Sequence, residues 1–287
     1  MAVLVDYNQV MLASLFASIG NHHNADISED MIRHMFLNSL RASRKKFHKE
    51  YGELVICADG KNSWRKNIFP YYKANRKKTR EESELDWNEL FRIMSSIREE
   101  LDENFPYKVI HFDSVEADDV IGSIVHENGT ILENNSEKFL ILSGDKDFVQ
   151  LHKYSNVYQY DPVRKKWITN SNPEQYLKEH ILKGDSGDGI PNIISDDNCL
   201  VIGKRQKPMT AKRMSVFLES IENMSDVEKK KYERNKILID LNSIPEMYKE
   251  KVIEKYNIPK VNMGNKILEY FMDKGLKNLM SDIGDFY

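Results

Sequence analysis

"FLILSGDKDF" occupies residues 139 to 148 and joins a short apolar run to two closely spaced carboxylates. A run of this length, rich in branched apolar side chains, is typical of a buried strand. Three other runs share this character and are separated by helical patterns: "AVLV" (2 to 5), "LVICA" (54 to 58) and "KVIHF" (108 to 112). Strands that alternate with helices predict an α/β fold, in which helices cover both faces of a mainly parallel sheet.

The chain changes character after residue 172, where helical patterns follow one another. They are "PEQYLKEHILKG", "AKRMSVFLESIENM", "VEKKKYERNKILIDL" and "NKILEYFMDKGLKNLM", with loops between residues 184 and 208 and at Pro245 and Pro259. Periodic apolar positions bounded by Gly and Pro indicate helices of ordinary length. We therefore expect an α/β domain over residues 1 to 180 and a smaller helical region over residues 181 to 287.

Composition is that of a globular protein. The chain has 287 residues, 40% of them hydrophobic and 30% charged, which is enough to bury a sizeable core as one large domain or two smaller ones. No stretch approaches the roughly 18 apolar residues of a membrane span, and the amino terminus lacks a signal-peptide pattern. We expect no membrane contact and a location in the cytosol. Cys57 and Cys199 fit no zinc or redox spacing, so we expect two reduced thiols.

Acidic residues follow every predicted strand. Three of the apolar runs are followed by Asp6, by Asp59, and by Asp145 with Asp147, while Glu116, Asp118 and Asp119 come shortly after the fourth. In "KGDSGDGIPN", Asp185 and Asp188 could share a face if the segment is helical. Ligands of an open parallel sheet bind beyond the carboxyl ends of its strands. The pattern therefore predicts a cluster of carboxylates at one edge of the sheet.

Taken singly, each of these acids fits an ordinary turn, an N-cap or a helix start. Together they would raise one another's pKa values and cost stability unless cations were bound. Ligands that are all oxygen favour Mg²⁺, with Mn²⁺ as a substitute, and the number of carboxylates indicates two ions. His22 and His23 lie in a polar, loop-like stretch and are not expected to be ligands. Two such ions suit phosphodiester hydrolysis without a protein nucleophile.

A basic and aromatic segment follows Asp59. "KNSWRKNIFPYYKANRKKTR" (61 to 80) interleaves Lys61, Arg65, Lys66, Lys73, Arg76, Lys77, Lys78 and Arg80 with Trp64, Phe69, Tyr71 and Tyr72. Cations follow a phosphate backbone and aromatic rings stack on unpaired bases, so the segment indicates nucleic-acid binding. A solvated basic helix whose aromatic side chains pack inward is the structural alternative. A second basic cluster, "GKRQKPMTAKR" (203 to 213), could hold duplex backbone through its phosphates.

Five motifs, in this order, resemble those of the 5′-nuclease (flap endonuclease) superfamily, and are most similar to its T-even bacteriophage RNase H branch: "VDYN", "ADGKNSWRKNIFPYYKANR", "VEADDVIG", "SGDKDFVQL" and "KGDSGDGIPN". The resemblance implies a PIN-like α/β nuclease with a basic helical arch at about residues 61–85. It further implies a 5′–3′ exonuclease and flap endonuclease that removes RNA primers and adjacent DNA during lagging-strand replication.

The resemblance also implies roles for individual residues. The first metal would be surrounded by Asp6, Asp59, Glu116, Asp118, Asp119 and Asp145, and the second would be served by Asp147, Asp185 and Asp188. Lys73 and Arg76 would contact the scissile phosphate, with Asp118 and Asp145 at the reacting centre. Tyr72 would stack on a base, Arg65 would assist in the arch, and Lys77 would contact nucleic acid.

The chain departs from the family where many members carry a glycine-rich loop that binds duplex backbone and potassium. Here the sequence is "GIPNIISDDNCLVIGKRQKPMTAKR", in which Asp196 and Asp197 would repel phosphate, so bound potassium is not expected. Duplex contact would rest instead on Lys204, Arg205, Lys207, Lys212 and Arg213.

The implied partners are branched or nicked duplex DNA and RNA–DNA hybrid with a 5′ end, together with a single-strand-binding protein and a sliding clamp. The protein would be a monomer, in the cytoplasm of a bacterial host if a phage encodes it. The terminal "SDIGDFY" would be disordered or packed, or would serve as a docking peptide for the clamp. Two other functions stay open at this point, a DNA-junction binding protein without catalysis and a PIN-type ribonuclease for single strands.

Overall fold

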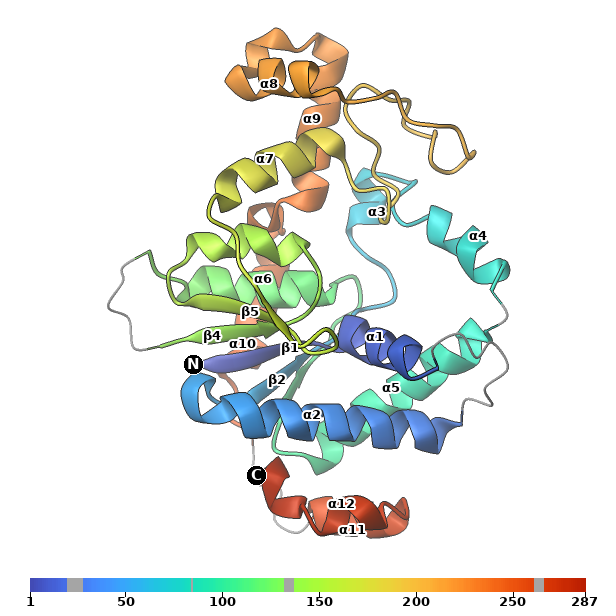
Figure 1. The fold of residues 1–287 in the computed structure, drawn as a ribbon, viewed down its shortest axis with the longest axis vertical. Coiled ribbons are helices and arrows are strands. Elements are labelled where there is room, and N and C mark those ends of the chain that lie inside the picture. The colour runs from blue at the N-terminus through green and yellow to red at the C-terminus, as the bar shows by residue number, and fades with distance from the viewer. Residues whose placement is uncertain (20–27, 84, 132–136, 261–265) are drawn as a thin grey trace.

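The centre of the molecule is a single sheet with helices on both faces (Figure 1). The computed structural model describes residues 1–19, 28–83, 85–131, 137–260 and 266–287, and within these residues the sheet has six strands. Its spatial order is β3-β2-β1-β4-β5-β6, with bounds β1 Ala2–Asp6, β2 Leu54–Cys57, β3 Lys108–Ile110, β4 Phe139–Leu142, β5 Val157–Asp161 and β6 Lys166–Ile168. Strands β1 to β5 pair in parallel, and β6 runs antiparallel to β5. The predicted α/β fold is confirmed.

The strands direct alternate side chains into two apolar layers. Val3 and Val5 of β1 pack into one buried cluster, whereas Leu4 packs into the other. Because both faces are covered, the first four strands have continuous apolar sequences, which made them predictable. The last two strands, β5 and the edge strand β6, were not predicted, since "VYQYD" and "KWI" contain too many polar and aromatic residues to form such a run.

Each layer is made of helices from separate parts of the chain. One layer contains α1 Tyr7–Ile19, α2 Glu29–Tyr51 and α5 Trp87–Asn104. The other contains α6 Ala117–Asn128, η1 Asp147–Lys153, η3 Leu241–Ser243 and α10 Glu246–Asn257. Helix α10 was not among the predicted helices, although it lies between the two predicted proline loops.

A further set of helices lies at the carboxyl edge of the sheet and beyond it. The basic segment forms two short helices, α3 Arg65–Ile68 and α4 Asn75–Glu81. Helices α7 Pro173–Lys183, α8 Ala211–Glu219 and α9 Asp226–Ile239, with the short η2 Ile221–Asn223, form the upper part of the molecule (Figure 1). Two small apolar clusters hold these helices together, one of which also includes Phe69 and Tyr72 of the basic segment.

The last helices return to the α/β core. They are α11 Lys266–Asp273, α12 Lys277–Met280 and η4 Ile283–Phe286. Phe271 and Phe286 are fully buried against Phe105, at ring-centroid distances of 6.1 and 5.7 Å. The tail is therefore packed, which is one of the expected alternatives, and it is not a free docking peptide in this structure. The helical region expected from residue 181 thus has two parts, one beyond the sheet edge and one in the core.

Two further expectations concern the chain as a whole. Cys57 and Cys199 are unpaired and buried. Among the helices that the structure describes, none combines the length and apolar character required to cross a membrane.

Candidate metal centre

Acidic side chains from different parts of the fold meet at the carboxyl edge of the sheet. Asp6 ends β1, Asp59 follows β2, and Glu116 and Asp118 begin α6, while Asp145 and Asp147 follow β4. Asp185 and Asp188 come from the loop after α7, which is not helical. Parallel pairing places the ends of β1, β2 and β4 side by side, so the convergence follows directly from the topology.

One group consists of Asp118, Asp145 and Asp147, whose carboxylate oxygens lie within 4.8 Å of one another. Burial raises the pKa of Asp118 well above its ordinary value, and the neighbouring Asp145 and Asp6 raise it further. Burial also raises the pKa of Asp147 to about 8, with the charge of Asp145 acting in the same direction. Three acids held this close are costly as anions, and a divalent cation would relieve that cost.

Asp6 extends this group toward β1. Its Oδ2 accepts a hydrogen bond from Ser143 Oγ at 2.8 Å, and its Oδ1 accepts one from the backbone N–H of Gln9 at 3.3 Å. Burial and the charges of Asp59 and Asp145 nevertheless raise the pKa of Asp6 to about 8. The two hydrogen bonds fix the orientation of the carboxylate without neutralising it.

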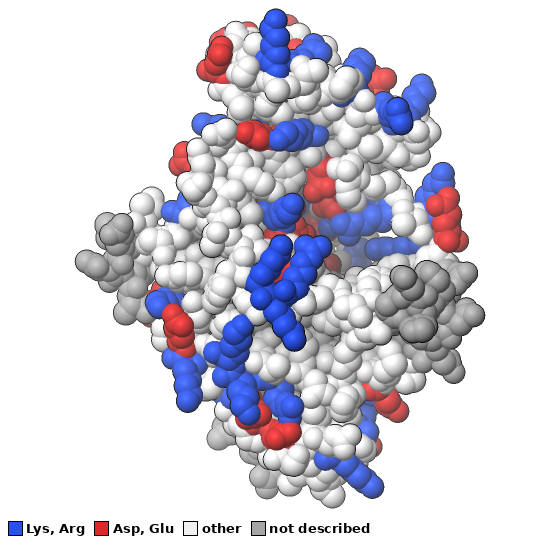
Figure 2. All heavy atoms as spheres, viewed as in Figure 1, with Lys and Arg blue, Asp and Glu red and all other residues white. Residues whose placement is uncertain are grey.

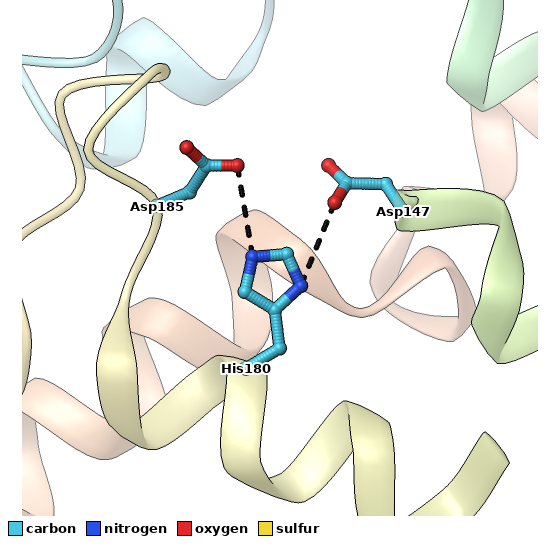
Figure 3. A group of neighbouring side chains, drawn as sticks. All are labelled: Asp147, His180 and Asp185. Carbon is cyan, nitrogen blue, oxygen red and sulfur yellow. Dashed lines mark ion pairs between the residues drawn. The ribbon is translucent and has the colours of Figure 1, made fainter. Parts of the chain in front are cut away.

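A second group shares Asp147 with the first and consists of Asp147, His180 and Asp185 (Figure 3). His180 Nδ1 lies 3.5 Å from Asp147 Oδ1, and His180 Nε2 lies 3.6 Å from Asp185 Oδ2. Burial alone would lower the pKa of His180, but Asp185 and Asp147 hold it above its ordinary value. The same imidazole holds the pKa of Asp185 below its ordinary value, against the effect of burial.

His180 lies beside two of the predicted ligands, whereas the predicted ligand set contained no histidine. The only sequence signal is its place five residues before Asp185 in the last turn of α7. Within a helical pattern, a histidine at that position is indistinguishable from a surface residue. The two histidines that were considered and set aside, His22 and His23, lie outside the described residues.

Glu116 is neutralised by cations of the basic segment. Its Oε2 accepts hydrogen bonds from Ser63 Oγ at 2.9 Å and Arg65 Nη1 at 3.0 Å, while Lys73 Nζ contacts Oε1. Burial would raise the pKa of Glu116, yet Lys73 and Arg65 lower it to about 2. The hydroxyl of Tyr72 lies within hydrogen-bond distance of Glu116, at 2.8 Å.

Asp188 contacts the same segment. Arg76 Nη2 is paired with Asp188 Oδ1, and Lys73 Nζ lies 3.5 Å from Asp188 Oδ2. The backbone N–H of Lys73 also donates to the carbonyl of Asp188 at 2.7 Å. Lys73 and Arg76 therefore lie at the acidic edge, directly beside the carboxylates.

Asp119 differs from the other expected ligands because it points into the core. Its fully buried carboxylate accepts hydrogen bonds from Trp64 Nε1 and Arg65 Nη1, both at 3.0 Å, and from the backbone N–H of Glu116 at 2.9 Å. The last bond is part of a capping box that begins α6. In this structure Asp119 therefore orients the helix and is not a member of either group.

The expected nucleic-acid contacts of Arg65 and Tyr72 are not met in this structure either. Arg65 is 3% exposed, and it donates to the carbonyl of Leu238 at 2.8 Å as well as to the two acids of α6. Tyr72 is also 3% exposed, and its ring is part of an apolar cluster, so it offers no face to a base. Both residues follow the structural alternative, in which the segment packs its long side chains inward.

The other basic side chains remain at the surface. A cavity of about 510 Å³ between the basic segment and α5 is lined by Lys61, Lys66, Lys73, Arg76, Arg80 and Arg98 together with Asp59 and Glu116. Lys77, Lys204, Arg205, Lys207, Lys212 and Arg213 are exposed. Figure 2 shows basic side chains around a hollow that contains acidic ones. Asp197, expected to repel phosphate, is paired with Arg234 and lies 3.8 Å from Lys231.

A mainly parallel sheet with a carboxylate cluster at its carboxyl edge, faced by lysine and arginine, is typical of hydrolases that act on phosphate esters with bound metal ions. The comparisons with known proteins specify the class further. A family described as 5′-3′ exonuclease, N-terminal resolvase-like domain, matches residues 1–181, and one described as T4 RNase H, C terminal, matches residues 171–286. The chain belongs to the 5′-3′ exonuclease family, and it is a structure-specific 5′ nuclease with an acidic metal-binding cluster.

Individual relatives agree with this assignment. The ribonuclease H of Enterobacteria phage T4 is 33% identical over 295 residues, which cover 99% of this chain and 95% of the relative. A 5′-3′ exonuclease of Buchnera aphidicola is 30% identical over 158 residues, which cover 52% of this chain and 50% of the relative.

Solved structures agree on the fold. A bacteriophage T5 protein co-crystallised with metal ions superposes with a TM-score of 0.61 at 18% identity, covering 88% of this chain and 98% of that one. A T5 flap endonuclease in complex with DNA and metal ions gives a TM-score of 0.60 at 16% identity, covering 95% and 97%.

Proposed function

We propose that the chain uses two Mg²⁺ ions, for which Mn²⁺ can substitute, to hydrolyse phosphodiesters at 5′ ends and 5′ flaps. We further propose that it removes RNA primers and adjacent DNA from lagging-strand fragments. One observation carries the proposal: two groups of potential ligands share Asp147, and Lys73 and Arg76 lie beside them. The bacteriophage T4 relative, whose name is ribonuclease H, supports RNA as part of the substrate.

The residues present fit such ions. Asp118, Asp145 and Asp147 would hold the first, and Asp147 and Asp185 would hold the second, with Asp6, Asp59, Glu116 and Asp188 around them. Such ions activate a water molecule for attack and stabilise the leaving oxygen. Hydrolysis of this kind gives a 5′-phosphate on the retained strand and 3′-hydroxyl ends on the released pieces.

The chain's own contribution is to place the phosphate. Lys73 Nζ reaches both Glu116 and Asp188, so it lies between the acids of α6 and those of the loop after α7. A phosphate that enters this edge would exchange these carboxylate partners for its own oxygens. Lys73 and Arg76 would thereby align the scissile bond and stabilise the charge that develops on it.

The surface beyond the edge suits a duplex. We propose that Lys204, Arg205, Lys207, Lys212 and Arg213 hold the backbone without reading its sequence, and that Lys77 contacts the single strand. We also propose that the protein is a monomer that acts in the cytoplasm of a bacterial host. Its further partners would be a single-strand-binding protein and a sliding clamp. These statements about oligomeric state, location and partners rest on the family resemblance.

The test uses three substrates: a 5′-flap DNA, an RNA-primed nicked duplex and a free single strand, each with Mg²⁺ or with chelator. We expect metal-dependent cleavage of the first two, with 5′-phosphate ends on the retained strand. Absence of metal-dependent cleavage on both duplex substrates would overturn the proposal. Tight duplex binding without cleavage would favour a junction-binding protein, and cleavage confined to free RNA would favour a single-strand ribonuclease.

A further inference from the structure

His180 distinguishes the two groups at the sheet edge. Asp118, Asp145 and Asp147 offer oxygen atoms alone, whereas the group of Asp147, His180 and Asp185 also offers an imidazole nitrogen. Figure 3 shows the ring of His180, from α7, placed between the two carboxylates, which come from the start of η1 and the loop after α7. The two groups therefore differ in ligand chemistry although they share Asp147.

The potential ligand atoms of this second group face one another. Asp185 Oδ1 accepts the backbone N–H groups of Gly187 and Asp188 at 2.7 and 3.2 Å, which leaves Oδ2 directed at His180. Among the residues that the structure describes, no hydrogen bond is made to the Asp147 carboxylate, and the His180 ring nitrogens approach only these two acids. The group lines an open pocket of about 500 Å³, which gives room for a hydrated ion.

The spacing fits coordination better than direct pairing. Nitrogen–oxygen distances of 3.5 and 3.6 Å exceed the roughly 2.7–3.2 Å of a good hydrogen bond. Neighbouring ligands on an ion with bonds of about 2.1 Å lie on the order of 3 Å apart. The two distances run to different ring nitrogens, but one ligand atom of each residue lies within 4.8 Å of the others. A turn of the imidazole that directs one nitrogen toward both carboxylates, with a small inward movement, would therefore bring the three side chains to a shared ion.

We propose that His180 supplies a nitrogen ligand to the second cation, so that Asp147, His180 and Asp185 form a mixed site that prefers Mn²⁺ to Mg²⁺. Carboxylates accept both Mg²⁺ and Mn²⁺, but Mn²⁺ is a first-row transition metal and forms a stronger bond with imidazole nitrogen than Mg²⁺ does. The oxygen-only group has no such preference. The inference rests on the proposed two-ion function and specifies the chemistry of one of its two positions.

The first experiment detects whether a nitrogen atom is bound to Mn²⁺. The full chain is freed of metal, loaded with two equivalents of Mn²⁺ and studied by pulsed electron paramagnetic resonance, which detects ¹⁴N bound to Mn²⁺. We expect ¹⁴N coupling in the wild type and its loss in His180→Gln. His48→Gln is the matched control, because His48 lies at the end of α2 beside the amino-terminal edge of the sheet, and the coupling should persist in it.

Affinity separates a ligand from a positioning residue. In His180→Gln an amide oxygen replaces the nitrogen, so the Kd of Mn²⁺ at the second position should rise on the order of tenfold while that of Mg²⁺ rises less than about threefold. In His180→Leu both should rise. An equal rise for the two ions in His180→Gln would mean that the residue only positions Asp147 and Asp185, and would overturn the proposal.

Two results of the resonance experiment would also overturn the proposal. The first is wild-type protein that binds two Mn²⁺ ions and shows no ¹⁴N coupling. The second is ¹⁴N coupling in the wild type that persists in His180→Gln. Failure of the proposed function would be visible elsewhere, as absence of cleavage on the duplex substrates. Cleavage without ¹⁴N coupling refutes the nitrogen ligand alone, and ¹⁴N coupling without cleavage refutes the nuclease function alone.

Discussion

Three acids within one helical turn have three different sets of partners. Glu116, at the N-cap of α6, is held by Lys73 and Arg65, while Asp118 faces Asp145 and Asp147. Asp119 turns inward to Arg65 and Trp64. Successive helix positions differ by about 100° in direction, so neighbours in sequence necessarily face different surroundings. Of the three, Asp118 has the strongest conflict between burial and charge.

Replacing Asp118 by Asn should abolish cleavage and stabilise the metal-free protein. The amide cannot provide an anionic ligand, but it also removes a carboxyl that is held near Asp145 and Asp6. We expect a gain in the free energy of unfolding on the order of 1–2 kcal/mol in chelator at pH 7. Thermal unfolding with chelator and a cleavage assay with Mg²⁺ measure the two effects. Asp113→Asn, at an exposed aspartate of the preceding loop, should change neither by much. A lowered melting temperature in Asp118→Asn would contradict the repulsion.

Replacing Arg65 by Ala should destabilise the fold. The substitution leaves Glu116 and Asp119 buried without one of their cations, and loss of one partner from a buried ion pair costs about 3–5 kcal/mol. Urea unfolding measures the loss of stability. Arg65→Lys should lose an intermediate amount, because lysine keeps the positive charge but lacks the two-pronged guanidinium group that bonds both acids. Lys66→Ala, at the exposed neighbouring residue, is the control. If Arg65 instead contacted nucleic acid, its Ala variant would resemble Lys66→Ala, with unchanged stability and weaker, less salt-dependent binding.

At the scale of elements, the loop after α7 is fitted to the basic segment through a glycine. Gly189 has φ +73°, and a Cβ there would lie 2.8 Å from the carbonyl oxygen of Tyr71 and 3.3 Å from the backbone nitrogen of Lys73. The same contact brings Asp188 to Lys73 and Arg76. The loop and the basic segment therefore position each other at the acidic edge.

Replacing Gly189 by Ala should separate the two elements. Gly203 is the matched control, since its φ is +72° and a Cβ added there would meet nothing within 4 Å. Gly203→Ala should cost about 1 kcal/mol of stability, because alanine is strained at a positive φ. Gly189→Ala should cost about 1–3 kcal/mol more because of the close contacts, and it should also lower kcat/KM. Chemical unfolding and the flap-cleavage assay provide the comparison. Equal effects in the two variants would show that the close approach has no importance.

Elements were predictable where one physical signal dominated. Buried strands such as "FLILS" are almost entirely apolar, and the acids that follow them fall at the sheet edge by topology alone. The edge strand β6 gave no signal because "KWI" is only three residues long and is not an apolar run; its Trp167 remains 47% exposed. The inward burial of Arg65 and Tyr72 depends on α9, which lies more than 150 residues away in sequence. The contact of His180 with Asp147 is equally a product of tertiary packing, which local sequence patterns do not report.

At the scale of the whole molecule, charge is separated although the net charge is only −3. The acids lie at the sheet edge, and cations of the basic segment and of residues 204–213 lie around them (Figure 2). Lys73 and Arg76 neutralise Glu116 and Asp188, but Asp6, Asp118 and Asp147 have no cation in contact among the described residues, apart from the His180 ring beside Asp147. We therefore expect bound cations from solution to stabilise the fold at this edge.

This imbalance predicts how stability depends on pH. In the folded protein Asp6 and Asp147 have pKa values of about 8, compared with 3.8 for an ordinary aspartate, so between these values the folded state binds protons that the unfolded state has released. The free energy of unfolding must then fall as pH rises through this window. His180, whose pKa is raised, acts in the same direction, while Glu116 contributes a constant amount above about pH 5.

We therefore expect the metal-free protein to lose on the order of 3 kcal/mol of stability between about pH 5.5 and pH 8.5. Mg²⁺ replaces the protons with bound positive charge, so saturating Mg²⁺ should suppress most of this loss, and the rise in Tm that it causes should grow with pH. Thermal unfolding at several pH values, with chelator and with Mg²⁺, measures both trends. Asp6→Asn should partly flatten the curve in chelator, because it removes one of the groups whose pKa is raised in the folded protein. A Tm in chelator that stays constant or increases toward the alkaline end of this range would show that the carboxylates are already neutralised within the protein, and that the acidic edge does not require a cation.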